Sequence, residues 1–219
     1  MRFTRRSLGC VVVDDVSFVA EHLQAPPARV LEVGCGSGKL ALELSERGWD
    51  VTAIDPEAPE GPIFRRVALE DFDGPGPFDA VVAQRSLHHI HDLEAAVERI
   101  ASLLAPGATF VLVEFAHERL DGDTADWYLG QLAALHAAGR AEAPARDVEE
   151  LRTEYDELHT SEAMLAALRE RFDELRFERT PYLYGELGGV ASEALERTLI
   201  EAGAIDPTGF RWVGVSRRV

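Results

Sequence analysis

Three glycines, Gly34, Gly36 and Gly38, alternate with other residues directly after the apolar run Arg29 to Val33. An apolar strand followed by such a turn lets the backbone approach a nucleotide closely, because glycine adopts conformations that a side chain would block. A turn of this kind binds a phosphate, a dinucleotide, or a nucleoside without phosphate. The residues around the glycines discriminate among these ligands.

A phosphate loop needs a glycine five positions before Gly38 and a Ser or Thr after the lysine, where this chain has Val33 and Leu40. A dinucleotide site would have its third glycine at position 39, which is Lys39, and the Glu32 carboxylate would lie beside a pyrophosphate. Glu32 suits a positively charged ligand better. S-adenosylmethionine combines adenosine with a cationic sulfonium and an ammonium group, so we expect it as the cofactor. An NAD-dependent oxidoreductase is the less favoured alternative.

The stretch LEVGCGSG, from Leu31 to Gly38, resembles a signature of the class I S-adenosylmethionine-dependent methyltransferases. Further segments resemble that family in order, including Asp55 at the end of a second strand and the Leu103–Ala108 turn. The resemblance implies that Asp55 accepts both ribose hydroxyls and that Glu70 or Asp71 accepts from the adenine amino group. The residues assigned to the cofactor are Glu32, Gly34, Cys35, Gly36, Gly38, Asp55, Pro56, Glu70, Asp71 and Gln84.

The segment after the fourth expected strand contains His88, His89 and His91. We expect no metal site there, because three histidines so close in sequence do not converge on one ion without a special loop. In the family that the chain resembles, these histidines mostly pack and cap the following helix, for which Asp92 is a suitable N-cap. A catalytic base is the other interpretation. His88, His89 and Glu114 are its candidates, and Glu114 is expected to face the substrate cavity at the end of the fifth strand.

Short apolar runs alternate with amphipathic segments over the first 115 residues, a pattern typical of βα units and a parallel sheet. We expect strands at 29–33, 50–54, 63–68, 78–83 and 108–115, and helices at 37–47 and 93–104. Strand character returns at 174–184 and 210–216, around a helix at 190–202. The resemblance implies a Rossmann-like, doubly wound, mostly parallel seven-stranded sheet in the order 3-2-1-4-5-7-6, with the last strand antiparallel.

The segment 117–159 interrupts the βα rhythm with Ala-, Glu- and Arg-rich helical sequence. We interpret it as a mobile helical cap inserted after the fifth strand into a single methyltransferase domain, 1–219. Caps of this kind close over substrates and exclude water. Trp127, Tyr155 and His159 are therefore candidates for binding the acceptor, although aromatic residues in a helix are also common in cores.

Thirty-nine acidic residues against twenty-two basic ones give a net charge of −17. This balance disfavours nucleic acid and anionic membranes as partners, because both bind clustered Lys and Arg. Two cysteines make no disulfide framework, which favours the cytoplasm. We expect a monomeric or homodimeric S-adenosylmethionine-dependent methyltransferase acting on a small-molecule O, N or C acceptor. The alternative is an S-adenosylmethionine-binding protein with other chemistry or a regulatory role.

Overall fold

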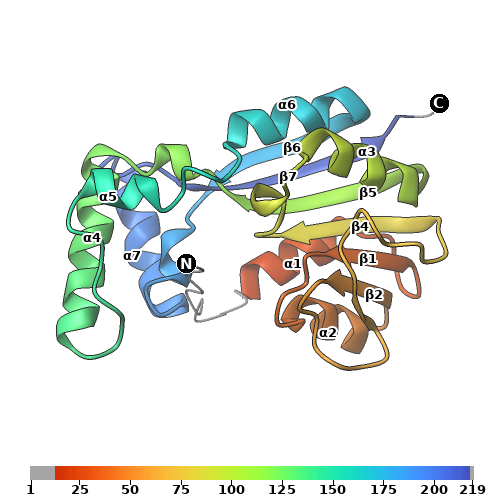
Figure 1. The fold of residues 1–219 in the computed structure, drawn as a ribbon, viewed down its shortest axis with the longest axis horizontal. Coiled ribbons are helices and arrows are strands. Elements are labelled where there is room, and N and C mark those ends of the chain that lie inside the picture. The colour runs from red at the N-terminus through yellow and green to blue at the C-terminus, as the bar shows by residue number, and fades with distance from the viewer. Residues whose placement is uncertain (1–12, 218–219) are drawn as a thin grey trace. The chain divides into compact units, whose positions relative to one another are not determined.

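A seven-stranded sheet organises the chain in the computed structural model, which describes residues 13–217 (Figure 1). The strand order is β3-β2-β1-β4-β5-β7-β6, so the expected Rossmann-like fold class is confirmed. The strands are β1 (Arg29–Val33), β2 (Asp50–Asp55), β3 (Phe64–Arg66), β4 (Phe78–Gln84), β5 (Leu104–Phe115), β6 (Phe172–Thr180) and β7 (Gly209–Ser216).

The first five strands run parallel, with β1 paired to β2 and β4, β2 to β3, and β4 to β5. Their carboxyl ends therefore meet at one edge of the sheet. β7 runs antiparallel to β5. The Gly107 N–H near the start of β5 donates to Ser216 Oγ at the end of β7 (3.2 Å), and the Ala116 N–H just after β5 donates to the carbonyl of Thr208 just before β7 (2.7 Å).

Helices α2, α3 and α7 lie where the sequence predicts them, whereas α1 and α6 fall outside the predicted helical ranges. Asp92 caps α3, as expected, because its Oδ1 accepts from the Ala95 N–H at 3.0 Å. The helices are α1 (Val13–Glu21), α2 (Lys39–Glu46), α3 (Leu93–Leu103), α4 (Gly122–Ala137), α5 (Val148–Thr153), α6 (Ser161–Arg171) and α7 (Val190–Glu201). No helix within residues 13–217 is long and apolar enough to cross a membrane.

The described chain divides into two compact units. Unit 1 contains residues 115–158 and 179–210, and unit 2 contains residues 13–114, 159–178 and 211–217. Helices α4 and α5 occupy about half of the expected cap, 117–159, and belong to unit 1 together with α7. The single domain and the closing movement of a cap stay predictions. Cys10 lies outside the described residues.

Each unit buries its own apolar side chains. In unit 2 the rings of Phe110, Phe172 and Trp212 pack together, with centroids 5.6 to 5.9 Å apart. In unit 1 the Phe115 ring stacks on the Tyr182 ring at 4.4 Å, within a core that α4 and α5 supply. Unit 2 contains both the glycine turn and the histidine segment, so the candidate site lies within one unit.

Candidate functional site

The glycine turn folds back onto the end of β2. The N–H groups of Gly34 and Cys35 both donate to the carbonyl of Ile54, at 2.9 and 3.1 Å. Gly34 has a φ of +71°, and a Cβ there would lie 2.3 Å from the Cβ of Ser86, so only glycine fits. Gly36 has a φ of +50°, and a Cβ there would meet nothing within 4 Å, because the turn faces open space at this residue.

Asp55 ends β2 beside this turn. Its Oδ2 accepts from the Gly36 N–H at 3.0 Å, and its Oδ1 accepts from the Glu57 N–H at 2.7 Å. Each carboxylate oxygen has a further lone pair with which it can accept from a ligand hydroxyl. The acid therefore shapes the turn and keeps the capacity to bind a ribose.

A cavity of about 880 Å³ lies at the carboxyl edge of the parallel strands. This volume is within the range of small-molecule sites. Of the residues assigned to the cofactor, Gly34, Gly36, Asp55, Pro56 and Glu70 line it. Its wall also contains Val33, Ile54, Val67, Ala68, Leu69, Arg85, Ser86, His89, Ile90, His91, Asp92, Ala95, Ala96 and Arg99.

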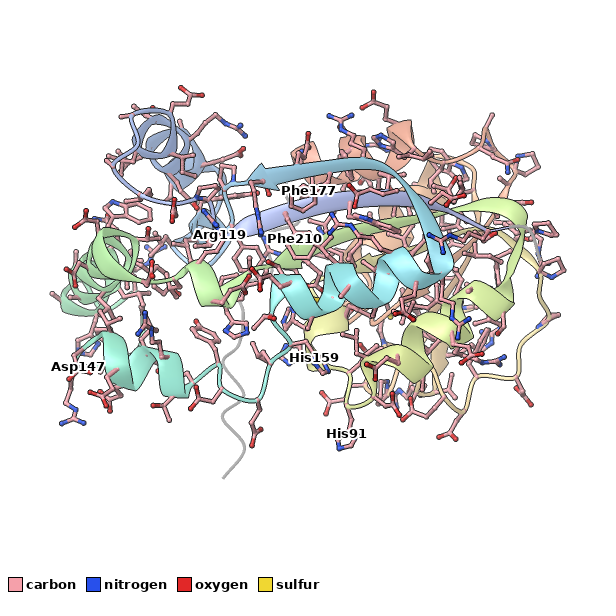
Figure 2. The ribbon with its side chains drawn as sticks, turned by 90° about the horizontal axis from the view of Figure 1, so that it is seen from above. His91, Arg119, Asp147, His159, Phe177 and Phe210 are labelled. Atoms are coloured by element: carbon pink, nitrogen blue, oxygen red, sulfur yellow. The ribbon has the colours of Figure 1, made fainter. Side chains whose placement is uncertain are left out.

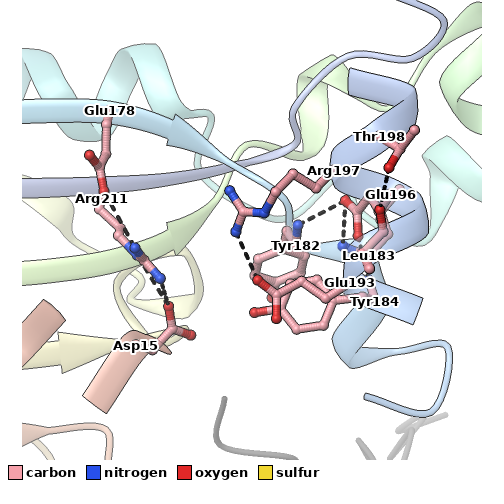
Figure 3. A network of polar contacts seen from close by, with 11 residues as sticks. Asp15, Glu178, Tyr182, Leu183, Tyr184, Glu193, Glu196, Arg197, Thr198 and Arg211 are labelled. Atoms are coloured by element: carbon pink, nitrogen blue, oxygen red, sulfur yellow. Dashed lines mark hydrogen bonds and ion pairs between the residues drawn. The ribbon is translucent and has the colours of Figure 1, made fainter. Parts of the chain in front are cut away.

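The other residues assigned to the cofactor do not line this cavity. Asp71 is exposed beyond it, and Gly38 lies against the Phe64 ring. Gln84 extends away from the wall, because its Nε2 donates to Asp15 at 3.2 Å. Asp15 also accepts from Arg211 at 2.7 Å (Figure 3). Gln84 thus belongs to a buried polar network between β4, α1 and β7.

Glu32, near the end of β1, and Cys35, within the glycine turn, are both buried. Glu32 is buried and its Oε2 has no hydrogen-bond partner. Burial raises the pKa of Glu32 to about 8, and nearby Asp55 adds to the rise. Burial, with the charges of Glu32 and Asp55, raises the pKa of the Cys35 thiol to about 12, so this thiol is not nucleophilic at neutral pH.

The three candidates for catalysis occupy different places. His89 lines the cavity, and partial desolvation, followed by the charge of His88, lowers its pKa. His88 and Glu114 are buried and are absent from the cavity wall. The expectation that Glu114 faces the cavity is wrong: its carboxylate contacts the N–H groups of Ser86 and Leu87 and the His88 ring.

His159 contacts the backbone of the histidine segment at two residues. Its N–H donates to the His88 carbonyl at 3.1 Å, and its Nε2 lies 2.7 Å from the Ile90 carbonyl. With His91 it lines a second cavity of about 520 Å³. Figure 2 labels both histidines. No three His, Cys, Asp or Glu side chains within residues 13–217 form a group that could hold a metal ion.

The aromatic candidates for acceptor binding pack within unit 1. Trp127 and Tyr155 lie partly buried against its core, and the Tyr155 ring meets the Phe115 ring edge-on at 5.3 Å. This placement agrees with the alternative interpretation, in which these aromatic side chains are part of a hydrophobic core. Their role toward an acceptor stays a prediction.

Several residues of the cavity wall were not predicted from the sequence to line a ligand site. Arg85 and Ser86 follow β4 at the carboxyl edge, where ligands bind open α/β sheets. Asp92, Ala95, Ala96 and Arg99 share one face of α3 at spacings of three and four. The position of Arg85 and Ser86 directly after a strand, and the helical spacing of the α3 residues, could have indicated that they line the site.

Together, the sheet order, the glycine turn, the acid at the end of β2 and the cavity at the carboxyl edge define a Rossmann-like protein that binds a nucleoside cofactor. The open space at Gly36 and the cavity volume fit S-adenosylmethionine. Residues 4–155 match the family model described as a methyltransferase domain. The chain therefore belongs to this family, within the class I S-adenosylmethionine-dependent methyltransferases. This confirms the resemblance seen in the sequence and assigns S-adenosylmethionine to the chain as cofactor.

Curated relatives match only part of the chain. An uncharacterized methyltransferase of Mycobacterium tuberculosis is 35% identical over 126 residues, covering 51% of this chain and 61% of the relative. A ubiquinone biosynthesis O-methyltransferase of Xanthomonas campestris pv. campestris is 38% identical over 112 residues, covering 44% of this chain and 47% of the relative. The chain thus spans about half to three fifths of the relatives' length.

Solved structures share the fold over nearly the whole chain. An S-adenosylmethionine-dependent methyltransferase from Mesorhizobium loti matches with a TM-score of 0.59 and 17% identity, covering 91% of this chain and 95% of that one. An N1-methyltransferase of 1,6-didemethyltoxoflavin from Burkholderia thailandensis matches with a TM-score of 0.57 and 18% identity, covering 94% and 78%. At these identities the likeness shows the fold alone.

Proposed function

We propose that this protein transfers a methyl group from S-adenosylmethionine to a small-molecule acceptor, with His89 as the general base. The observation that carries the proposal is the cavity of about 880 Å³, which brings together the glycine turn, Asp55 and His89. The glycine turn and Asp55 suit a nucleoside, and His89 is a proton acceptor on the same wall. Family membership supports the reaction class.

The chain's own residues would hold the cofactor in distinct ways. The open backbone at Gly36 lets a ligand approach where a side chain would intrude. Asp55 would accept from the ribose hydroxyls, and Glu70, on the cavity wall, would accept from the adenine amino group. Asp71 and Gln84 are less suited, because neither lines the cavity.

When bound, S-adenosylmethionine supplies an electrophilic methyl group and leaves as a neutral thioether. The protein therefore needs chiefly to align the acceptor in a dry pocket and to accept its proton. The lowered pKa of His89 keeps its imidazole neutral near pH 7, which is the form that accepts a proton. His88 and Glu114 are too deeply buried to touch an acceptor.

A small molecule is the acceptor class that the chain's charge favours. A net charge of −17 repels the phosphates of nucleic acids. The name of one relative specifies O-methylation in ubiquinone biosynthesis, and one structural neighbour is named as an N1-methyltransferase of 1,6-didemethyltoxoflavin. Phenols and amines are therefore the acceptors to test first.

Calorimetry with S-adenosylmethionine, S-adenosylhomocysteine and NAD tests the cofactor assignment. We expect binding of the first two and none of NAD. Transfer of a labelled methyl group to a panel of phenols and amines then tests the reaction. His89→Asn should lower turnover about 10²- to 10⁴-fold. In the pH–rate profile of the wild type, the apparent pKa on the acid side should lie below the ordinary histidine pKa of about 6.5.

Two results would contradict this function. Binding of NAD without S-adenosylhomocysteine would favour an oxidoreductase. Tight binding of S-adenosylhomocysteine with no transfer to any panel member, by protein that retains its cofactor affinity, would favour the alternative of a regulator or an enzyme with other chemistry. Size-exclusion chromatography of the same samples tests the expected monomer or homodimer.

A further inference from the structure

One buried carboxylate gathers three donors from three consecutive residues. Glu114 Oε1 accepts from the N–H groups of Ser86 and Leu87, at 2.8 and 2.6 Å, and Oε2 contacts His88 Nδ1. The Glu114 side chain is 0% exposed. A buried charge is costly unless hydrogen bonds satisfy it, so Glu114 and the turn at 86–88 stabilise each other.

The turn needs such support because it begins in an unfavourable conformation. Arg85 has a φ of +55°, in the left-handed region that residues with side chains rarely adopt. The Arg85 N–H still donates to the Val113 carbonyl at 2.8 Å, which continues the pairing of β4 with β5. Such strain persists only where the surroundings fix it, and Glu114 fixes the residues that follow.

The same turn forms part of the cofactor cavity. Ser86 Oγ donates to the Val33 carbonyl at 2.8 Å, and the Ser86 Cβ occupies the space that a Cβ at Gly34 would need. Ser86 and His89 both line the cavity. Ser86 is therefore held against β1 by a bond that does not involve Glu114, and the turn that begins with Ser86 leads directly to His89 on the cavity wall.

His88 connects the buried carboxylate to His89. The His88 ring is 4% exposed, and its centroid lies 4.2 Å from that of the His89 ring at an interplanar angle of 48°. The His88 carbonyl also accepts from the His159 N–H, which holds the segment from its other side. His88 is thus fixed on both sides and provides a surface against which the His89 ring packs.

We propose that Glu114 and His88 are positioning residues that fix the turn at 86–88 and so hold the His89 ring at the cavity wall. The inference rests on the proposed function, in which His89 accepts the acceptor's proton. Neither Glu114 nor His88 contacts ligand or acceptor in this assignment. Both act only through the orientation of His89.

Three substitutions separate this role from simple packing. Glu114→Gln keeps the size of the side chain but removes the charge that accepts from all three donors. His88→Leu removes the ring donor, whereas His88→Asn keeps a donor near the place of Nδ1. Glu98→Gln is the matched control, because this exposed acid on α3 makes a surface ion pair with Arg171 at 3.6 Å.

The measurements are S-adenosylhomocysteine affinity, NMR relaxation of the His89 imidazole, and turnover with the phenol or amine that the panel identifies. The His89→Asn spectrum assigns the His89 signals. In Glu114→Gln and His88→Leu we expect the His89 signals to broaden by exchange and kcat to fall tenfold or more. The KM for S-adenosylmethionine and the S-adenosylhomocysteine affinity should stay within threefold. His88→Asn should recover most of kcat, and Glu98→Gln should match the wild type.

Two outcomes would overturn the inference. Unchanged His89 signals in both Glu114→Gln and His88→Leu would show that the pair does not position this ring. A parallel loss of S-adenosylhomocysteine affinity and turnover would show that the pair merely supports the cofactor loop. Full turnover in His89→Asn would instead contradict the proposed function, so failure of the two proposals can be distinguished. Thermal unfolding of each variant identifies any that do not fold. If Glu114→Gln or His88→Leu does not fold, recovery of most of kcat in His88→Asn supports the positioning role.

Discussion

Asp55 has two roles in the proposed site: its carboxylate accepts from the Gly36 N–H, and we propose that it also accepts from a ribose hydroxyl. Asp55→Ala removes both contributions. We expect S-adenosylhomocysteine affinity to fall by about 1.5 to 3 kcal/mol, or roughly ten- to hundredfold, the usual cost of losing hydrogen bonds to a charged group. Calorimetry measures this directly. Asp50→Ala at the other end of β2 is the control, since Asp50 is exposed and should leave affinity unchanged. Equal affinities in both variants would remove Asp55 from the site.

Glu32 makes stability depend on pH in a defined direction. Its pKa is about 8 in the folded protein against 4.5 ordinarily, so the folded state binds the proton more tightly than the unfolded state between these values. The free energy of unfolding therefore falls as pH rises from about 4.5 to 8, and this group contributes a loss of up to about 4 to 5 kcal/mol.

The comparison of wild type with Glu32→Gln isolates this contribution. The amide resembles the protonated acid and does not titrate, so the two proteins should have similar stability near pH 5, and the variant should become relatively more stable toward pH 8. Urea unfolding at several pH values measures the difference. For Glu46→Gln, on the exposed part of α2, the free energy of unfolding should change with pH in the same way as that of the wild type. Parallel curves for Glu32→Gln as well would show that Glu32 titrates normally.

At the scale of elements, Glu196 joins α7 to the turn that follows β6. Its carboxylate accepts from the N–H groups of Tyr182, Leu183 and Tyr184, at 2.9, 3.1 and 2.7 Å (Figure 3). Burial nevertheless raises the pKa of Glu196, because desolvation outweighs these three bonds. The contact lies wholly within unit 1, so it stabilises that unit without touching the cofactor cavity.

Glu196→Ala should therefore destabilise the protein by about 3 to 5 kcal/mol, because three buried N–H groups lose their acceptor. Urea unfolding gives the change. Glu201→Ala, at the exposed end of the same helix, should change stability by less than about 0.5 kcal/mol. The S-adenosylhomocysteine affinity of folded Glu196→Ala should equal that of the wild type. A loss of affinity in that variant would mean that this turn influences the cofactor cavity.

The elements themselves were largely predictable from the sequence. Turn residues and apolar runs placed β1 at 29–33 as observed, and α3 and α7 each ended one residue earlier than expected. β5 began four residues before its predicted start, because Leu104 pairs with Phe78 across the Pro106-Gly107 irregularity. β3 was shorter than expected, covering 64–66.

The direction of side chains was harder to predict than the strands that carry them. Residues 110–115 of β5 are all buried, so the sequence offers no alternation from which to decide where Glu114 points. The same holds for Gln84 at the end of the buried strand β4. The glycine turn was predictable because its residues act through backbone geometry, which their spacing reveals. The Glu114–His88 contact joins residues from two strands' ends and required the structure.

At the scale of the whole molecule, the proposed cofactor-binding residues and the proposed helical cap belong to different compact units. The residues that line the cavity of about 880 Å³ all fall within 33–99, in unit 2. Trp127 and Tyr155 pack against the core of unit 1. A ligand that binds only unit 2 stabilises its local structure directly, so the response of the two units to the cofactor should differ.

Hydrogen exchange with and without saturating S-adenosylhomocysteine measures this response. We expect slower exchange in peptides covering the glycine turn, the end of β2 and the segment 85–92, because the ligand opposes opening of the structure that binds it. Peptides from α4 and α5 should exchange at the same rate in both samples. Asp55→Ala, at a ligand concentration that leaves it unbound, should show none of the protection and serves as the control. Protection that extended over 117–158 would show that the cofactor alone orders the proposed cap, whereas we expect that step to require the acceptor.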